Sequence, residues 1–267
     1  MQKGHGISAG SKAPDPRYLA DVDSSIVPVM CRANDYPAGH CIGLHTHAKE
    51  QLLYAVHGVM MVSVNGGQWI VPSTRGIWIP AGMRHAIRCI GDVHMRSIYV
   101  SPSAASHLPK DTRVVGISPL LRELIQAAKD VPPAYSTNSR DGRLMRLLLD
   151  EFNTLPVLPL HLPQPADKRL QRICMRLLKS PGDGATLGDW AKLLLVDVKT
   201  IQRLFSRETG MTFGQWRQQA RLLRALELLA SGEKVVEVAL ALGYDSPSAF
   251  AAMFKRQFGQ TPGEFFR

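Results

Sequence analysis

Hydrophobic positions change their spacing about halfway along the chain. Short apolar runs such as LLYAVHGVMMVSVNG (52–66) and GIWIPAG (76–82) are separated by glycine-containing turns, a pattern typical of β-strands. From residue 118 onward, apolar residues instead recur every three or four positions, which is the spacing of one helix face. The pattern predicts an α+β chain in which a small β-barrel or jelly roll is followed by a helical linker and an all-α C-terminal domain.

The last third of the chain contains one phrase twice. LFSRETGMTFGQW (204–216) and MFKRQFGQTPGEF (253–265) match at five positions, and each ends on an aromatic residue. Upstream of each phrase, the sequence predicts a short helix, a tight turn and a second helix. Each copy is therefore a candidate helix-turn-helix, over about residues 187–208 and 235–258.

Capping residues support both predictions. Asp197 and Ser246 are good N-caps for the two second helices, and a glycine follows each of these helices as a C-terminal cap. A longer helix over 214–231 is predicted to join the copies. In the turn of the second copy Gly243 suits a positive φ. The first copy has Leu195 at this position, so we expect a less regular turn there.

The second helix of the first copy has a polar side opposite an apolar stripe. The polar side carries Lys199, Gln202 and Arg203, and arginine and glutamine are good readers of base edges in the major groove. From Ala166 onward there are 16 Lys and Arg against 10 Asp and Glu, a modest excess, so placement rather than charge favours DNA. The alternative is a helical bundle that uses the duplicated unit for packing alone. The joining helix adds three arginines suited to core-edge packing or to phosphates: Arg217, Arg221 and Arg224.

The final hundred residues resemble the DNA-binding domain of the AraC/XylS family of transcription regulators. The matching phrases are IQRLFSRETGMTF, RLLRALELL and VVEVALALGYDSPSAFAAMFKRQFGQTP. The resemblance implies that two helix-turn-helix units on one monomer enter successive major grooves, about 34 Å apart. Because alanine cannot donate a hydrogen bond to guanine, the first unit is expected to supply most of the sequence discrimination. The implied DNA-binding residues are Lys199, Gln202, Arg203 and Arg207, then Ser248, Ala249 and Ala252, with Lys255 and Arg256 near phosphates.

Two phrases in the N-terminal half resemble the paired motifs of cupin barrels. GLHTHAKEQLLYAVHG (43–58) contains HxH followed by an acidic residue, and IPAGMRHAI (79–87) contains PxGxxH. Such a barrel is the sensor domain of many AraC/XylS members, so the resemblance implies a site for a small effector. Trp69, Trp78 and Tyr54, with Met60 and Met61, would favour an aromatic or otherwise apolar effector.

Strand alternation places His45, His47 and Gln51 on one face, where His85 could join them, whereas Glu50 points the other way. These four residues could line an effector cavity or hydrogen-bond inside the barrel. They could instead hold a divalent metal such as Zn, Ni or Fe. The carboxylate that usually neutralises such an ion is missing from this face, so we expect no resident cofactor, with the metal as the less favoured alternative.

Two helical patterns, SPLLRELIQAAKDV (118–131) and RDGRLMRLLLDEFNTL (140–155), follow the barrel. Each could bury its leucine stripe against the barrel, or the pair could form a dimer interface, as the resemblance implies. A dimer would favour a repeated or palindromic DNA site. The expected organisation is a flexible arm (1–24), the cupin-like barrel (25–106), the helical pair with a Pro-rich linker (107–165) and the DNA-binding domain (166–267).

Composition narrows the class of function. The net charge of +10 is compatible with an anionic partner, and no apolar run is long enough to span a membrane. The sequence has no nucleophile–base triad, phosphate loop or paired carboxylates that would indicate catalysis. We therefore expect a cytoplasmic, effector-responsive DNA-binding regulator, a homodimer that works with RNA polymerase if it activates transcription. The alternatives are a cupin dioxygenase or isomerase with an accessory DNA-binding tail, and a constitutive DNA-binding protein whose barrel only dimerises.

Overall fold

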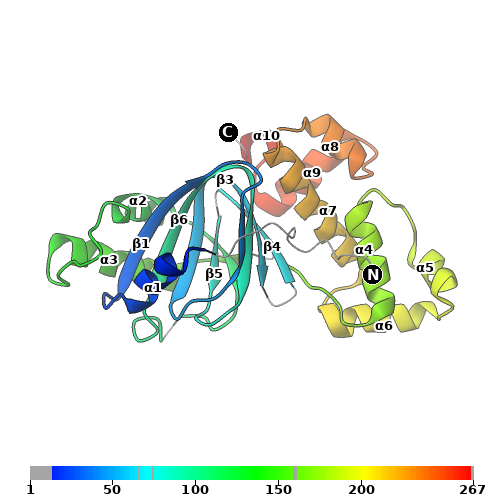
Figure 1. Ribbon diagram of the computed structural model, residues 1–267. Coiled ribbons are helices and arrows are strands. Elements are labelled where there is room, and N and C mark those ends of the chain that lie inside the picture. Colours follow the sequence, from blue (N-terminus) through cyan, green and yellow to red (C-terminus); the bar gives the residue numbers. More distant parts are fainter. Residues whose placement is uncertain (1–13, 65–66, 74, 107, 159–160, 266–267) are drawn as a thin grey trace. The chain divides into compact units, whose positions relative to one another are not determined.

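The computed structural model describes residues 14–64, 67–73, 75–106, 108–158 and 161–265 (Figure 1). The chain divides into two compact units, and the second begins at His161. This boundary lies within the Pro-rich stretch that the sequence predicts as a linker.

The first unit is built on antiparallel strands joined in the order β1-β6-β3-β5-β7-β8, with β2 added to β6 and β4 added to β3. The sheet extends beyond residue 106, where the sequence placed the end of the barrel, because two further strands join its edge. The strands are β1 (Val29–Tyr36), β2 (Cys41–His45), β3 (Glu50–Val64), β4 (Gly67–Pro72), β5 (Arg75–Ile79), β6 (His85–Val100), β7 (Arg113–Gly116) and β8 (Val157–Leu158).

Strands β3 and β6 pair along almost their whole length and bend together (Figure 1). The register between them shifts on both sides of His57, and the next residue, Gly58, has φ +84°. A Cβ atom at Gly58 would lie 2.2 Å from the carbonyl oxygen of Asp92, so only glycine allows this close approach. Beyond the bend β2 continues along the same edge of β6 that β1 occupies.

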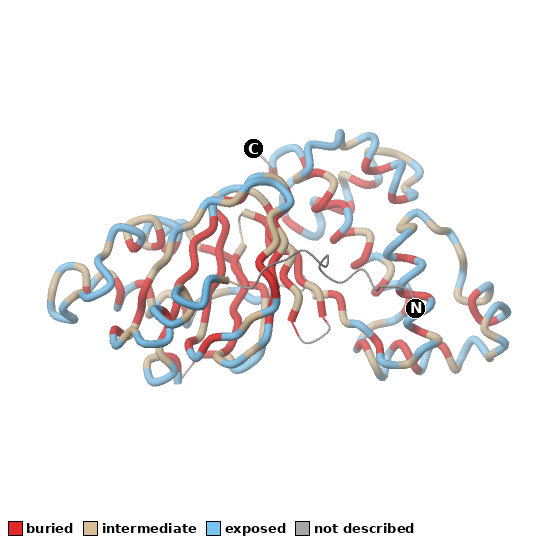
Figure 2. The backbone as a smooth tube through the Cα atoms, viewed as in Figure 1, coloured by how far each residue is buried: buried red, intermediate tan, exposed pale blue. Residues whose placement is uncertain are grey.

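The α+β organisation is confirmed, but the closed barrel is not. In the described part of the chain, the strand pairings form a curved, open sheet whose order runs from β1 to β8. Figure 2 shows its buried residues running along the strands. Closure needs continuous pairing around the ring, and alternation within single strands contains no information on whether the first and last strands meet.

Two helices, α2 (Pro119–Ala128) and α3 (Arg140–Glu151), complete the core of the first unit. Both pack against β1, and part of each predicted leucine stripe is buried there. On the outer side of the pair, Leu120 is 49% exposed and Leu147 is 44% exposed. The buried residues that the helices contribute are Leu121, Ile125, Ala128, Met145 and Leu148.

Part of the segment predicted as a flexible arm is helical. Asp15 caps α1 (Pro16–Ser24) by accepting a hydrogen bond from the backbone N–H of Arg17 (2.8 Å), and proline at the first position favours a helix start there. Val22 is buried in a small cluster with Met30 of β1. This packing fixes the helix against the sheet.

The second unit is all-helical apart from the short β9. The two predicted helix-turn-helix units are present as α5–α6 and α8–α9, joined by α7, whereas α4 is a further helix with an apolar stripe that includes Leu170 and Ile173. The elements are β9 (His161–Leu162), α4 (Lys168–Lys179), α5 (Leu187–Leu194), α6 (Val198–Thr209), α7 (Phe213–Ala230), α8 (Val235–Ala241), α9 (Pro247–Phe258) and α10 (Pro262–Phe265).

The turns of the two helix-turn-helix units have the same left-handed conformation with different residues. Leu195 has φ 53° and its side chain is 92% exposed, whereas Gly243 has φ 73°. A Cβ at Gly243 would also lie 3.0 Å from the carbonyl oxygen of Gly182. Leucine in this conformation is strained because its Cβ crowds the following carbonyl.

We expect Leu195→Gly to raise the free energy of unfolding of the second unit by about 0.5–1 kcal/mol. Relief of the left-handed strain exceeds the added entropy of glycine in the unfolded chain, and the exposed leucine gives up no buried contact. Urea unfolding followed by far-UV circular dichroism measures the change. The matched substitution Gly243→Ala should act in the opposite direction, by about 1–3 kcal/mol. A loss of stability in Leu195→Gly would contradict the strain argument.

Candidate DNA-reading surface and effector pocket

Helix α6 presents the predicted polar side to solvent. Its N-cap Asp197 accepts a hydrogen bond from the N–H of Lys199 (2.7 Å), which orients the first turn. Lys199, Gln202 and Arg203 are all exposed, and within the described residues these three side chains form no ion pair. The opposite side is the core of the unit, with buried Ile201, Leu204 and Phe205.

Helix α9 repeats this arrangement with smaller side chains. The hydroxyl of Ser246 accepts a hydrogen bond from the N–H of Ala249 (3.1 Å), and Pro247 occupies the first helical position. Phe250, Met253 and Phe254 are buried. The exposed positions that correspond to those of α6 have side chains with little hydrogen-bonding capacity: Ser248, Ala249 and Ala252. Two exposed basic residues follow them, Lys255 and Arg256.

Two arginines of α7 bond to the segment between α4 and α5, which leads into the first helix-turn-helix unit. Arg217 donates to the carbonyl of Ala185 (3.1 Å), just before α5, and Arg221 donates to the carbonyl of Pro181 (2.8 Å). Arg224 pairs with Glu227 on its own helix (2.6 Å). Of the two roles that the sequence left open for these arginines, the contacts therefore favour packing at the core edge.

Three histidines of the first unit converge, although the predicted strand is interrupted and His47 lies in the segment between β2 and β3. One ring nitrogen of each of His45, His47 and His85 lies within 4.8 Å of those of the other two. Gln51 joins them, since its Oε1 lies 3.1 Å from Nε2 of His47. Glu50 does not join them, because its carboxylate accepts a hydrogen bond from the N–H of Ala81 (2.9 Å).

Each of the three rings is held by its Nδ1–H, which donates to a backbone carbonyl two residues away. Burial lowers the pKa of His85 to about 3, with a smaller contribution from neighbouring His45, and burial also lowers the pKa of His45. These two rings are therefore neutral near pH 7. The three hydrogen bonds are His45 to Gly43 (2.8 Å), His47 to Lys49 (2.7 Å) and His85 to Met83 (2.9 Å).

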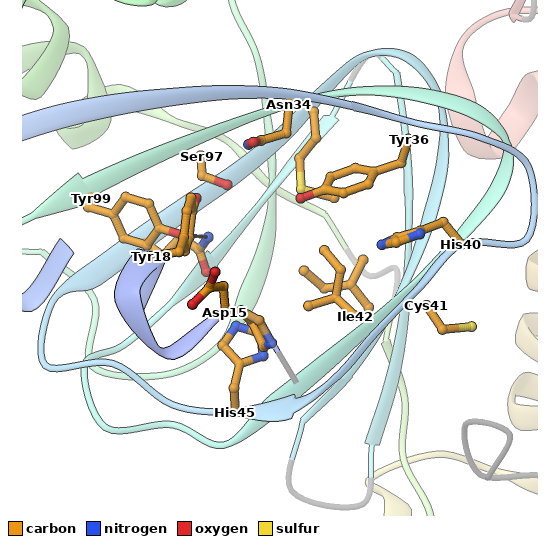
Figure 3. A pocket seen from close by; sticks show the side chains of 14 residues that line it. Asp15, Tyr18, Asn34, Tyr36, His40, Cys41, Ile42, His45, Ser97 and Tyr99 are labelled. Atoms are coloured by element: carbon orange, nitrogen blue, oxygen red, sulfur yellow. Dashed lines mark hydrogen bonds between the residues drawn. The ribbon is translucent and has the colours of Figure 1, made fainter. Parts of the chain in front are cut away.

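A pocket with a volume of about 330 Å³ adjoins this cluster (Figure 3). His45 and Gln51 belong to its lining. From Gln51, a row of hydrogen bonds runs to the hydroxyl of Tyr99 (3.2 Å) and on to that of Tyr18 on α1 (3.2 Å). Further apolar and polar lining comes from Tyr36, Ile42, Ile87 and Met95, and from Asp15, Asn34, His40, Cys41 and Ser97.

The aromatic residues that line the pocket are different from those that the sequence suggested. Tyr54 and Trp78 are buried in the core beneath α2 and α3, and Trp69, Met60 and Met61 are also absent from the lining. Tyr18, Tyr36 and Tyr99 take their place, with Tyr18 and Tyr99 side by side in Figure 3. These tyrosines lie on α1, β1 and β6, and no local motif connects them.

Two helix-turn-helix units joined by one helix, together with a separate unit that contains a pocket, define a ligand-binding transcription regulator. Residues 27–195 match the family model of the AraC-like ligand binding domain, and residues 190–267 match that of a helix-turn-helix domain. The chain belongs to the AraC family. It is a DNA-binding transcription regulator with an N-terminal domain of the ligand-binding type.

The chain is similar to two curated transcription regulators and, more distantly, to one solved structure. The HTH-type transcriptional regulator NimR of Escherichia coli is 36% identical over 222 residues, which cover 83% of this chain and 81% of NimR. RipA of Corynebacterium diphtheriae, also an HTH-type transcriptional regulator, is 33% identical over 40% of this chain and 31% of RipA. The crystal structure of ToxT from Vibrio cholerae covers 90% of this chain and 98% of ToxT, with 12% identity and a TM-score of 0.37.

The named relatives are regulators, so the protein is not an enzyme and the alternative of a cupin dioxygenase or isomerase is set aside. Among the residues described by the structure, no helix is both long and apolar enough to cross a membrane.

Proposed function

We propose that a small effector binds in the pocket of the first unit and changes the affinity of the two helix-turn-helix units for DNA. The observation that supports this proposal is the row of hydrogen bonds from Gln51 through Tyr99 to Tyr18 along a pocket that also contains apolar side chains such as Ile42 and Met95. Polar groups held in place beside apolar side chains are typical of small-molecule sites, and about 330 Å³ is at the lower end of their range. To regulate, the effector must bind the DNA-competent state and the incompetent state with different affinities.

On the DNA, Lys199, Gln202 and Arg203 of α6 would contact base edges in one major groove. Their exposure on the helix face opposite the core supports this role. Helix α9 would contribute less discrimination from Ser248, Ala249 and Ala252. Basic residues at the ends of both helices would contact phosphates: Arg207, Lys255 and Arg256.

The finer partners belong to the same proposal. The protein would form a homodimer through the outer side of α2 and α3, where Leu120 and Leu147 remain exposed. It would act in the bacterial cytoplasm, where chromosomal DNA is found, and as an activator it would contact RNA polymerase. No resident cofactor is required for effector binding itself.

The decisive experiment is a screen for compounds that bind to the protein. Compounds that raise the melting temperature of the full-length protein are selected from a library of small aromatic and carboxylate molecules. Their effect on operator affinity is then measured by fluorescence anisotropy at one fixed salt concentration, on a DNA site obtained by binding-site selection. We expect at least one compound to change the affinity by about 5- to 150-fold.

Ile42→Trp should abolish this response, because the larger side chain fills the pocket that Ile42 lines. Leu44→Trp is the matched control, since Leu44 is on the same strand but 53% exposed and outside the lining. An effector response that survives in Ile42→Trp would place the binding site elsewhere. If no compound changes operator affinity, the protein is instead a constitutive DNA-binding protein.

A further inference from the structure

In each of the three clustered histidines of the first unit, Nδ1 makes the hydrogen bond to the backbone, and Nε2 is the ring nitrogen that this bond leaves unused. In each ring the Nδ1–H donates to a backbone carbonyl, at 2.7–2.9 Å. A neutral imidazole has one N–H, so this bond selects the tautomer with a bare lone pair on Nε2. A carbonyl bond to the remote nitrogen is also the arrangement that fixes histidine ligands around metals.

Among the described residues, two of the leftover nitrogens, Nε2 of His85 and Nε2 of His47, lack a hydrogen-bond donor. Nε2 of His85 is fully buried and has no hydrogen-bond partner, although an unsatisfied buried acceptor costs about 1–3 kcal/mol. Nε2 of His47 faces Oε1 of Gln51 at 3.1 Å, which places two acceptors against each other. The amide of Gln51 has this orientation because its NH₂ donates to Tyr99 (3.2 Å). A cation between these atoms would satisfy all of them.

We propose that His45, His47 and His85 bind one divalent transition-metal ion through Nε2, with the amide oxygen of Gln51 contacting it. Imidazole ligands suit zinc and its first-row neighbours, and three histidines match the protein ligand count of open zinc sites. This inference goes beyond the proposed function, because the ion binds whether or not an effector occupies the pocket. It also reverses the expectation from the sequence, which weighed only the missing carboxylate.

The ligand set is neutral, which distinguishes this site from one that contains a carboxylate. Glu50, the acidic residue of the motif, is engaged with the N–H of Ala81 and is not in the cluster. The bound ion therefore keeps its charge of about +2. A carboxylate at position 51 would neutralise part of that charge and strengthen binding.

The test uses full-length protein stripped of metal with a chelator and titrated with zinc chloride in a calorimeter. We expect one zinc ion per chain, with binding at least tenfold weaker in His45→Ala because one of three protein nitrogens is lost. The control His94→Ala removes an exposed histidine outside the cluster and should bind like wild type. Gln51→Glu should bind zinc at least tenfold more tightly.

A second readout guards against misfolding of the variants. Zinc should raise the melting temperature of the wild-type protein by several degrees at about a hundredfold excess over Kd, and it should raise that of Gln51→Glu further. The proposal is overturned if zinc fails to bind the wild type, or if His45→Ala, shown to be folded by circular dichroism, binds it unchanged.

Discussion

Phe254→Ala should lower the free energy of unfolding of the second unit by about 3–5 kcal/mol. The ring of Phe254 has no solvent exposure. Its centroid lies 5.9 Å from that of Phe250, 4.6 Å from Phe258 and 5.3 Å from Phe265. Truncation leaves a cavity among three other rings and removes the edge-to-face contacts. Because these rings hold α9 and α10 together, operator binding should weaken as well.

Urea unfolding of the full-length chain, followed by far-UV circular dichroism, measures the effect of Phe254→Ala. Gln257→Ala is the control on the same helix, since Gln257 is exposed, and should change stability by no more than about 0.5 kcal/mol. The duplication extends the prediction to Phe205→Ala, because Phe205 is equally buried between Phe213 and Trp216. A cost similar to that of the control would mean that the shared phenylalanine is not a core residue of either copy.

The helices of the second unit were predictable because their signals are local. A capping side chain acts on an N–H two or three residues away, and an apolar stripe repeats within one turn. The predicted joining helix 214–231 is α7 (Phe213–Ala230), and Asp197 and Ser246 are both N-caps. Helix α4 carries the same kind of local stripe, although the duplicated phrase does not extend to it.

The pocket was less predictable because its parts meet only through the fold. The sequence places His47 and Gln51 on one face of a continuous strand. In the structure β2 ends at His45 and β3 begins at Glu50, yet the two side chains still meet at 3.1 Å. The hydroxyls of Tyr18 and Tyr99 meet across 81 residues of sequence, and no spacing rule relates an N-terminal helix to strand β6. The unpaired Nε2 of His85 could not be predicted from the sequence either, because it depends on which polar atoms lie near the ring in the folded chain.

The sequence indicates the position of the strained turn but not its backbone conformation. The sequence suggests that Leu195 makes the first turn less regular than the one containing Gly243, yet both adopt left-handed φ values. The helix geometry on either side sets the conformation, and the residue determines only its energetic cost. Leu195 is almost fully exposed, so its side chain contributes no packing that would offset this cost.

Arg203→Ala should weaken binding to the cognate operator by about 1–3 kcal/mol and relax the sequence preference at the base that Arg203 contacts. Arg203 is exposed on α6, opposite the buried Ile201 and Leu204, and its side chain has no partner in an ion pair among the described residues. An arginine placed in this way can donate two hydrogen bonds to one guanine. Fluorescence anisotropy at fixed salt, on the selected operator and on single-base variants of it, measures both effects.

Arg207→Ala provides the comparison, one turn further along α6. Arg207 pairs with Glu208 at 3.2 Å and is proposed to contact phosphate, so its loss should weaken all sites about equally and reduce the dependence of affinity on salt. Arg203→Ala should instead flatten the difference between the cognate base and its replacements at a single position. If Arg203→Ala also weakens every sequence by the same factor, Arg203 contacts phosphate, and the discrimination of this helix comes from Lys199 and Gln202.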